Sequence, residues 1–304
     1  MPLYYELASI RAQLQSSASA YIKSCDAAFH QAVEAAALSA IGERRKLLML
    51  AGPSASGKTT TARFLADVIR RKGGRAYTVS LDDFYYDNGK GPKNPDGTND
   101  YESVDSLDIP MFCRCMMQLL DGRMTELPVF DFITGRRSEK TRSLVLAQQD
   151  CLIIEGLHAL NPQITSNLPR ETLFLLYISV SSRVRTGERQ ILSKRDTRLM
   201  RRLVRDYHFR ASSPENTFAL WQQVCAGETR YLFPFEENAQ YKINSFLGYE
   251  PAVFAAAAPD LLRRIPAESP YYQKAQELLH ALSYFEPLSS ELVPGDSLLR
   301  EFIG

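Results

Sequence analysis

The sequence predicts an α/β fold with a doubly wound parallel sheet and helical additions at both ends of the chain. Two observations lead to this prediction. Short apolar runs such as 47–50 and 173–178 alternate with longer segments whose apolar residues have helical spacing. The run 47–50 is also followed by a glycine-rich turn, as in a buried parallel strand that leads into a helix. Because this alternation is typical of β–α–β units, we expect a parallel sheet with crossover helices.

The individual elements follow in chain order from the same patterns. The first forty or so residues are rich in alanine and have helical periodicity, which predicts one or two helices. The polar stretch 87–99 reads as a surface loop because of its glycines and prolines. We therefore divide the chain into an N-terminal helical extension (1–45), a central domain (46–250) and a C-terminal helical appendage packed on it (251–304). In these, we expect helices at 59–71, 107–120 and 273–282, and strands at 47–50, 76–81, 151–154 and 173–178.

The composition excludes several classes of protein. Of the 304 residues, 45% are hydrophobic and 23% are charged, which is close to the average for folded globular domains. The formal net charge of +1 gives no overall field that would attract nucleic acid or a membrane. The five cysteines are scattered, so we expect reduced thiols. With neither a leader nor a membrane-spanning pattern in the sequence, we expect a cytoplasmic protein; its oligomeric state, including a homo-oligomer, is left open.

A phosphate-binding loop is the strongest local signal. The segment 52–59 fits the pattern G-x-x-x-x-G-K-[ST], and it lies between a predicted strand and a predicted helix. In such a loop, backbone N–H groups surround nucleotide phosphates, a lysine reaches the β and γ phosphates, and a hydroxyl binds Mg²⁺. The motif predicts a donor site and leaves the acceptor open, because GTPases, ATPases and kinases share it. The expected nucleotide-binding residues are Gly52, Ser54, Ala55, Ser56, Gly57, Lys58, Thr59 and Thr60.

Three carboxylates follow predicted strands or the polar loop. Asp82 comes directly after the second apolar run, at the end of a strand where open α/β sheets bind ligands. It could accept the proton of an acceptor hydroxyl, or it could only cap the turn. Glu155 ends the strand 151–154, which suits a carboxylate that binds Mg²⁺ opposite Thr59, or one that merely ends a strand. Glu102 lies before the helix at 107–120, where a carboxylate would also favour a helix N-terminus.

An arginine-rich segment lies between residues 183 and 210. Arg198, Arg202 and Arg205 fall at positions i, i+4 and i+7, which places them on one face of a helix. Such a face could neutralise charge on a transferring phosphoryl group as part of a lid at about 195–215. A solvated basic face and an RNA contact are the alternatives. His158 and His208 are isolated, and we interpret both as ordinary polar or partly buried residues.

Taken in order, these segments resemble the uridine kinase and phosphoribulokinase family. The resemblance rests on five ordered motifs. The later stretches 232–237, 243–250 and 297–304 look like the bacterial uridine-kinase-like branch, so the likeness extends from about Lys46 to the C-terminus. It implies ATP and Mg²⁺ as cofactors, with Thr59 and Glu155 serving the metal. It implies a small-molecule acceptor, with Asp82 as base, Glu102 on a ribose diol and Tyr85 against the substrate. The lid arginines Arg202, Arg205 and Arg210 would hold phosphates and acceptor. The motifs are GPSASGKTT at 52–60, SLDDFY at 80–85, PVFDF at 128–132, IEGLH at 154–158 and DTRLMRRLVRD at 196–206.

Two positions depart from the family pattern. Uridine-cytidine kinases have a tyrosine where this chain has Phe130 and a histidine where it has Gly135, and those two residues help to read the pyrimidine. Loss of such hydrogen-bonding groups changes specificity strongly. The sequence therefore supports kinase activity better than it supports a preference for uridine.

We expect an ATP-dependent kinase that phosphorylates a ribose-bearing acceptor, such as the 5′-OH of a nucleoside, and we expect neither nucleic acid nor membrane as a partner. One alternative is a kinase for another hydroxylated metabolite such as a sugar phosphate. Extra basic residues near Glu102 would favour it, and only Lys90 and Lys93 lie there. The other alternative is a nucleotide-binding regulatory or RNA-associated protein. Asp82, Glu155 and the arginines argue against it, because pure binding does not need all three.

Overall fold

The centre of the molecule is a five-stranded sheet in which all paired strands are parallel. The structure is a computed structural model that describes residues 3–94, 97–132 and 134–304. The predicted parallel sheet is confirmed, and the strand order places the first strand of the sheet in the middle. In spatial order the strands are β12 (Tyr241–Asn244), β9 (Leu173–Ser179), β2 (Leu47–Ala51), β8 (Asp150–Glu155) and β3 (Arg75–Ser80).

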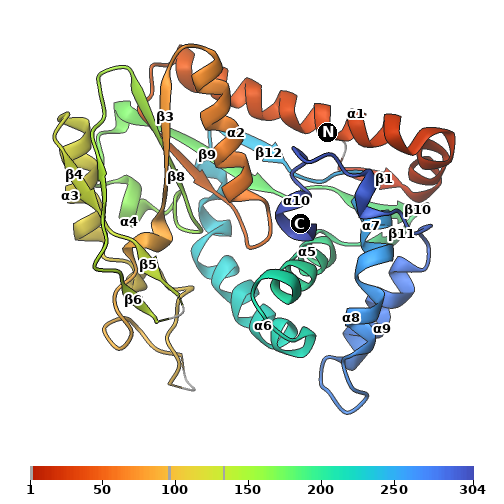
Figure 1. Cartoon of the computed structure of the whole chain (residues 1–304). Helices are drawn as coiled ribbons and strands as arrows, with labels where there is room; N and C mark the ends of the chain where they lie inside the picture. Colours follow the sequence, from red (N-terminus) through yellow and green to blue (C-terminus); the bar gives the residue numbers. More distant parts are fainter. Residues whose placement is uncertain (1–2, 95–96, 133) are drawn as a thin grey trace.

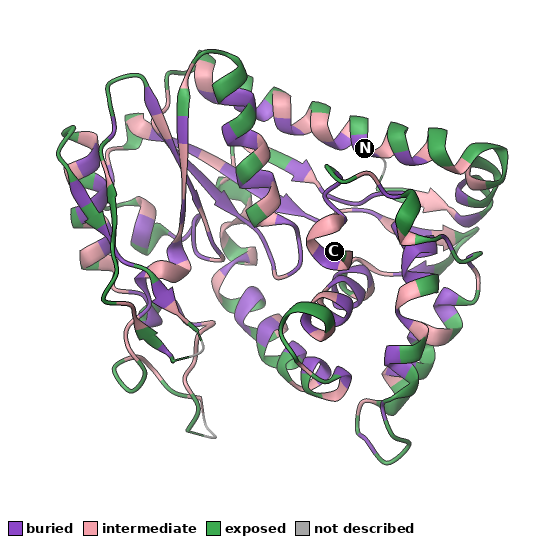
Figure 2. Cartoon of the chain, in the orientation of Figure 1, coloured by how far each residue is buried: buried purple, intermediate pink, exposed green. Residues whose placement is uncertain are grey.

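Side chains alternate along the strands and divide the interior into two cores. Leu48 and Leu50 of β2 point into one core, whereas Leu47 and Met49 point into the other. The first core is covered by α1 and α2, and the second by α3 and α4 (Figure 1). Figure 2 shows that the central strands and the inner faces of the helices hold most of the buried positions. The bounds of these helices are α1 (Leu7–Gly42), α2 (Lys58–Arg71), α3 (Ile109–Leu120) and α4 (Pro162–Thr165).

Helices from the C-terminal half complete the first core. α5 (Lys194–Phe209) and α6 (Pro214–Tyr231) lie beside the phosphate-binding loop, and α7 (Glu250–Ala257) packs on α5. The chain then forms α8 (Pro259–Arg263) and α9 (Tyr272–Leu282) and returns to α5 through the short helix α10 (Arg300–Ile303). Residues of α1 and of α7–α10 thus share one core with α2. The division of the chain at residues 45 and 250 stays a prediction.

The predicted elements are present, with shifts at their ends that side chains explain. The strand expected at 76–81 ends at Ser80, because the Ser80 hydroxyl accepts a hydrogen bond from the N–H of Asp82 (3.3 Å) and starts a tight turn. The helix expected from residue 107 begins at Ile109, since Asp108 caps it by accepting from the N–H of Met111 (2.9 Å). The N-terminal helical region is a single segment with a break at Ser17, whose φ is −164°.

Small sheets at the periphery were not predicted. β1 (Tyr4–Glu6) pairs with β10 (Arg183–Thr186), which forms a hairpin with β11 (Arg189–Leu192). The arginine-rich segment is therefore divided between this hairpin and α5. Two more pairs, β4 (Thr125–Leu127) with β7 (Arg142–Leu144) and β5 (Phe130–Asp131) with β6 (Arg136–Arg137), lie beyond β3. All these strands have only two to four residues, too few for an alternating pattern to stand out.

Among the described residues, no helix combines the length and the apolar character that crossing a bilayer requires.

Candidate active site

The phosphate-binding loop connects the carboxyl end of β2 to the first turn of α2. Gly52 approaches the neighbouring strand so closely that a Cβ there would lie 2.3 Å from the carbonyl oxygen of Ile178. Gly57 has a φ of +91°, and a Cβ at this position would lie 2.5 Å from a methyl carbon of Leu298. Both glycines of the motif are thus required by the geometry of the loop. Ala55, between them, also takes a left-handed conformation, with a φ of +58°.

Two buried arginines from α5 attach the loop to the rest of the molecule. Arg198 forms a bidentate pair with Glu228 of α6 (2.6 and 2.8 Å) and donates to the carbonyl oxygen of Ser54 (3.0 Å). Glu228 in turn accepts from the N–H of Ser54 (2.8 Å). The side chains of Arg198 and Glu228 are 3% and 0% exposed, so solvent does not screen the attraction between their charges. Arg198 therefore supports the loop and does not lie on a solvated basic face.

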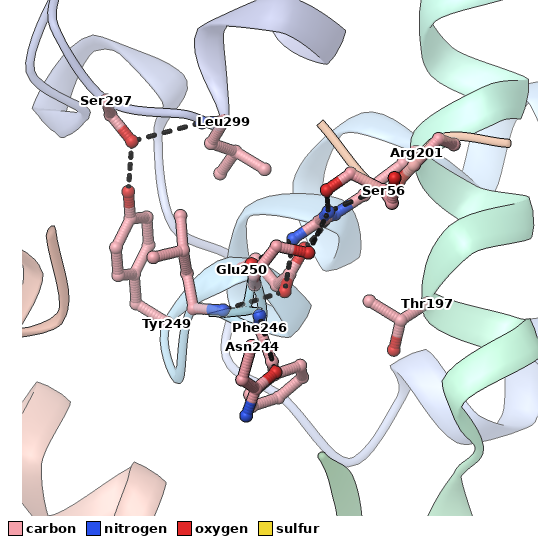
Figure 3. A network of polar contacts seen from close by, with 12 residues as sticks. Ser56, Thr197, Arg201, Asn244, Phe246, Tyr249, Glu250, Ser297 and Leu299 are labelled. Carbon is pink, nitrogen blue, oxygen red and sulfur yellow. Dashed lines mark hydrogen bonds and ion pairs between the residues drawn. The ribbon is translucent and has the colours of Figure 1, made fainter. Parts of the chain in front are cut away.

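Arg201 makes the second attachment. Its guanidinium forms a bidentate pair with Glu250 (2.7 and 3.0 Å), and both side chains are fully buried. It also donates to the carbonyl oxygens of Ala55 (3.3 Å) and Ser56 (3.4 Å). Figure 3 shows Arg201 between the loop and Glu250 at the start of α7. In this way, residues about 150–200 positions apart in the chain fix the backbone of the loop.

A cavity of about 770 Å³ opens on the outer side of the loop, at the carboxyl ends of the central strands. This is the position where open α/β sheets bind ligands. Most of the site residues predicted from the sequence lie on the wall of this cavity. Several residues that were not predicted lie there as well. The lining residues are 54–59, Asp82, Tyr85, Tyr101, Glu102, Phe132, Glu155, Leu157, Arg202, Arg205, Phe209, Arg210, Ala211 and Glu301.

Three carboxyl groups in this cavity have raised pKa values. Burial raises the pKa of Asp82 above its usual range, against the opposing effect of Lys58. Burial and the nearby Glu228 raise the pKa of Glu102 to about 7, while Arg202 acts to lower it. Burial likewise raises the pKa of Glu155 to about 7, opposed by Lys58. Raised carboxyl pKa values in a cavity with cationic partners are typical of functional sites.

The arginines that face the cavity are held by one buried carboxylate. Asp206 of α5 lies 3.1 Å from Arg202, 3.0 Å from Arg205 and 3.5 Å from Arg210, measured between side-chain nitrogen and oxygen atoms. Arg202 also donates to the hydroxyl of Ser54 in the loop (2.8 Å). Because Asp206 is buried and carries one charge against three, the cluster keeps a net positive charge toward the cavity.

Aromatic side chains form part of the cavity wall. The rings of Tyr85, Tyr101 and Phe132 have pairwise centroid distances between 5.2 and 6.2 Å, in edge-to-face or tilted arrangements. The hydroxyl of Tyr85 donates to the carbonyl oxygen of Tyr101 (2.6 Å) and fixes its ring. Phe130 lies behind this wall, 5.0 Å from the ring of Phe132, and does not line the cavity.

Gly135 has no room for a side chain. Its φ is +65°, and a Cβ there would lie 1.9 Å from the side-chain nitrogen of Asn88. Asn88 is itself held through hydrogen bonds from the side chains of Asn99 and Tyr101. A histidine at position 135 would therefore require the side chain of Asn88 to move from its present place.

Several residues that were singled out in the sequence do not lie on the cavity wall. Gly52 and Thr60 do not line the cavity, although the backbone N–H of Thr60 donates to a carboxylate that does, Glu301 (3.2 Å). His158 is buried, and burial lowers its pKa to about 4, so it is neutral at pH 7 as an ordinary buried histidine would be. His208 lies in the last turn of α5.

The residues of the site that the sequence did not reveal include Tyr101, Phe132, Glu228 and Glu301. Phe132 belongs to the motif PVFDF, which gave a signal for it. Glu228 lies in a segment without a motif. Glu301 lies in the C-terminal stretch 297–304, to which the resemblance extends, but no role was predicted for it. Only the fold brings these two residues to the loop.

Comparisons with known proteins agree with this geometry. The model of the Phosphoribulokinase / Uridine kinase family matches residues 47–247. Uridine kinase of Lactobacillus johnsonii is 30% identical over 175 residues, which is 57% of this chain and 74% of that protein. Uridine kinase of Ureaplasma parvum is 22% identical over 200 residues, covering 65% of this chain and 86% of that protein.

Among solved structures, D-glycerate 3-kinase from Cryptococcus neoformans has a TM-score of 0.36 and 22% identity, covering 42% of this chain and 52% of that one. The family match extends over more than half of the chain and includes the loop, the three carboxylates and the arginines of α5. The chain belongs to the Phosphoribulokinase / Uridine kinase family of P-loop kinases, which bind ATP.

Proposed function

We propose that this protein transfers the γ-phosphoryl group of ATP to a hydroxyl of a ribose-bearing compound, and that the 5′-OH of a nucleoside is the best candidate. The observation that carries the proposal is the common cavity of Asp82, Glu102 and Lys58. Lys58 lies at the loop for the donor phosphates, and Asp82 lies in the turn that follows β3. Glu102 offers a carboxylate that can accept from two adjacent hydroxyls at once.

In this mechanism Asp82 is the general base. Its raised pKa brings the carboxyl closer to neutral pH, where a base removes a hydroxyl proton most effectively. Lys58, Arg202 and Arg205 stabilise the negative charge that spreads over the transferring phosphoryl oxygens. Arg210 and the backbone N–H groups of the loop hold the remaining donor phosphates.

Mg²⁺ would be held by Thr59 and Glu155. The hydroxyl of Thr59 lies 3.3 Å from a carboxylate oxygen of Glu155. Mg²⁺ usually binds one or two protein oxygens and completes its coordination with phosphates and water. Among residues 3–94, 97–132 and 134–304, no group of three or more His, Cys, Asp or Glu side chains is placed to hold a metal ion. When bound, the ion supplies charge for the β and γ phosphates.

The acceptor end of the cavity favours a compound with a flat ring over a sugar phosphate. The rings of Tyr85, Tyr101 and Phe132 offer an apolar, aromatic surface on which a base can pack. Lys90 and Lys93, the basic residues that could serve a second phosphate near Glu102, do not line the cavity. Gly135 and Phe130 supply no hydrogen-bonding side chain, so the preferred base need not be a pyrimidine.

The test is a panel of purine and pyrimidine nucleosides and phosphorylated sugars, assayed for acceptor-dependent release of ADP. We expect stimulation by at least one nucleoside and none by the sugar phosphates. Stimulation by a sugar phosphate alone would replace the nucleoside proposal. If ATP binds and no acceptor in the panel stimulates ADP release, the result favours the nucleotide-binding regulatory alternative.

Gly227 of α6 sets the position of Glu102. A Cβ at residue 227 would lie 2.4 Å from the Cβ of Glu102. We expect Gly227→Ala to push Glu102 away and to raise the KM for the acceptor about tenfold, which corresponds to about 1.4 kcal/mol. The KM for ATP should change little. Gly42→Ala is the matched control, because Gly42 is also helical and a Cβ there meets nothing within 4 Å. Equal acceptor KM values for both variants would contradict the assigned role of Glu102.

The raised carboxyl pKa values predict a pH dependence. Glu102 and Glu155, both with a pKa of about 7, must be ionised to accept from a diol and to bind Mg²⁺. Protonation below that value removes both functions, so kcat/KM for the acceptor should rise with pH between about 6 and 8, and then level off. Steady-state rates across this range give the profile. A rate that is flat or falls with pH there would show that neither carboxylate limits the reaction.

A further inference from the structure

The C-terminal segment, whose helix α10 packs on α5, also reaches the phosphate-binding loop. Its residue Glu301 accepts a hydrogen bond from the backbone N–H of Thr60 (3.2 Å), in the first turn of α2. The same carboxylate lines the cavity that contains Lys58, Glu155 and Arg210. Burial is the main cause of the raised pKa of Glu155, and the negative charges of Asp82 and Glu301 add to it.

This position is held by packing and does not depend on the carboxylate. Leu298, Leu299 and Phe302 are completely buried, and Phe302 lies under the guanidinium of Arg201 at 5.0 Å. Leu298 also packs against Gly57. The side chain of Arg300 donates to the carbonyl oxygens of Ser290 (3.1 Å) and Pro294 (3.3 Å), which fixes the turn before α10. A substitution at Glu301 therefore removes a functional group and leaves its support in place.

A carboxylate at this point competes with the donor. In loops of this kind the backbone N–H groups at the start of the helix bind donor phosphates. The N–H of Thr60 can donate fully to one acceptor, and here that acceptor is Glu301. A phosphate oxygen that takes its place must displace the carboxylate and then lies beside its negative charge, which is unfavourable in a partly enclosed cavity.

We propose that Glu301 is a further residue of the donor site, one that competes with a donor phosphate for the N–H of Thr60 and so weakens ATP binding. The inference rests on the proposed donor role of the loop. A carboxylate at this point also disfavours the retention of ADP, because the same N–H is needed by the product's phosphates. The fold thus carries a residue that keeps the nucleotide exchangeable.

The test measures the affinity of Mg²⁺·ATP by titration calorimetry for the wild-type chain and for Glu301→Gln and Glu301→Ala. We expect the dissociation constant to fall about threefold for Glu301→Gln, which loses the charge but keeps an acceptor. For Glu301→Ala, which frees the N–H, it should fall about tenfold, because hydrogen bonds to charged groups are the stronger ones. Glu291→Gln, an exposed glutamate in the same C-terminal segment, should bind ATP like the wild type.

The outcomes separate this inference from the proposed function. Equal affinity in all four proteins would overturn the role of Glu301 while leaving the donor site intact. Weaker binding by Glu301→Ala would show that the carboxylate holds the donor, which also overturns the competition. Absence of ATP binding in every protein would refute the donor site itself, and the competition with it. A thermal melt of each variant shows that the C-terminal packing is preserved.

Discussion

Asp82→Asn should lower kcat by about 10²–10⁴-fold, the usual contribution of a general base, and should leave ATP binding nearly unchanged. The substitution keeps the size and shape of the side chain but removes its ability to take a proton. Asp82 lies on the cavity wall just after the end of β3, whereas we propose that Lys58 and the loop bind the donor phosphates. Single-turnover rates at saturating ATP and acceptor measure the chemical step directly.

The neighbouring carboxylate provides the control for this prediction. Asp83 does not line the cavity and accepts from the N–H of Phe130 (3.3 Å) instead. Asp83→Asn should therefore keep kcat within a few-fold of the wild-type value. If Asp82→Asn turns over at the wild-type rate, Asp82 is not the base. If both variants lose activity together with ATP binding, the change is structural.

Arg201→Ala should destabilise the protein by about 3–5 kcal/mol, the range measured when one partner of a buried ion pair is removed. The substitution leaves the carboxylate of Glu250 fully buried without its bidentate partner, and it also frees the carbonyl oxygens of Ala55 and Ser56. Loss of these contacts should loosen the loop, so that the affinity for ATP falls as well. Urea unfolding followed by circular dichroism gives the change in free energy.

Arg195→Ala is the matched control, because Arg195 is an exposed arginine of the same helix. Its effect on unfolding should stay within about 0.5 kcal/mol, as for most surface substitutions. Similar losses for the two variants would mean that helix α5, and not the buried pair, accounts for the change.

Most of the central sheet could be predicted because its strands are buried on both faces. Such strands appear as continuous apolar runs, as at 47–50 and 173–178, and they alternate with helical patterns. The short peripheral strands lacked this signal. Strand β1, for example, pairs with β10 through a register between Tyr4 and Arg183, and no local pattern contains information about a contact across that distance.

In the candidate site, local motifs marked the residues that we propose to act on ligands, and the fold supplied the residues that support them. Gly57, Lys58 and Asp82 lie in short segments whose spacing follows from the chemistry. The helical spacing of the arginines on α5 could not show which of them are buried and which face the cavity. The i, i+4, i+7 pattern grouped Arg198 with Arg202 and Arg205, but Arg198 is buried against Glu228 while the other two face the cavity. Which arginine is buried depends on where α6 packs.

The attachments of the phosphate-binding loop have a consequence for folding. Its contacts with Glu228 and Glu301 bridge 174 and 241 positions of the chain. Closing loops of that length costs conformational entropy before any contact is gained, which slows folding. The β2–α2–β3 unit, whose own contacts are local, can form early, but the loop inside it acquires its final shape only when α5, α6 and the C-terminal turn have docked. Nucleotide binding should therefore be among the last properties to appear during refolding. The binding of ATP would then distinguish completely folded molecules from partially folded ones.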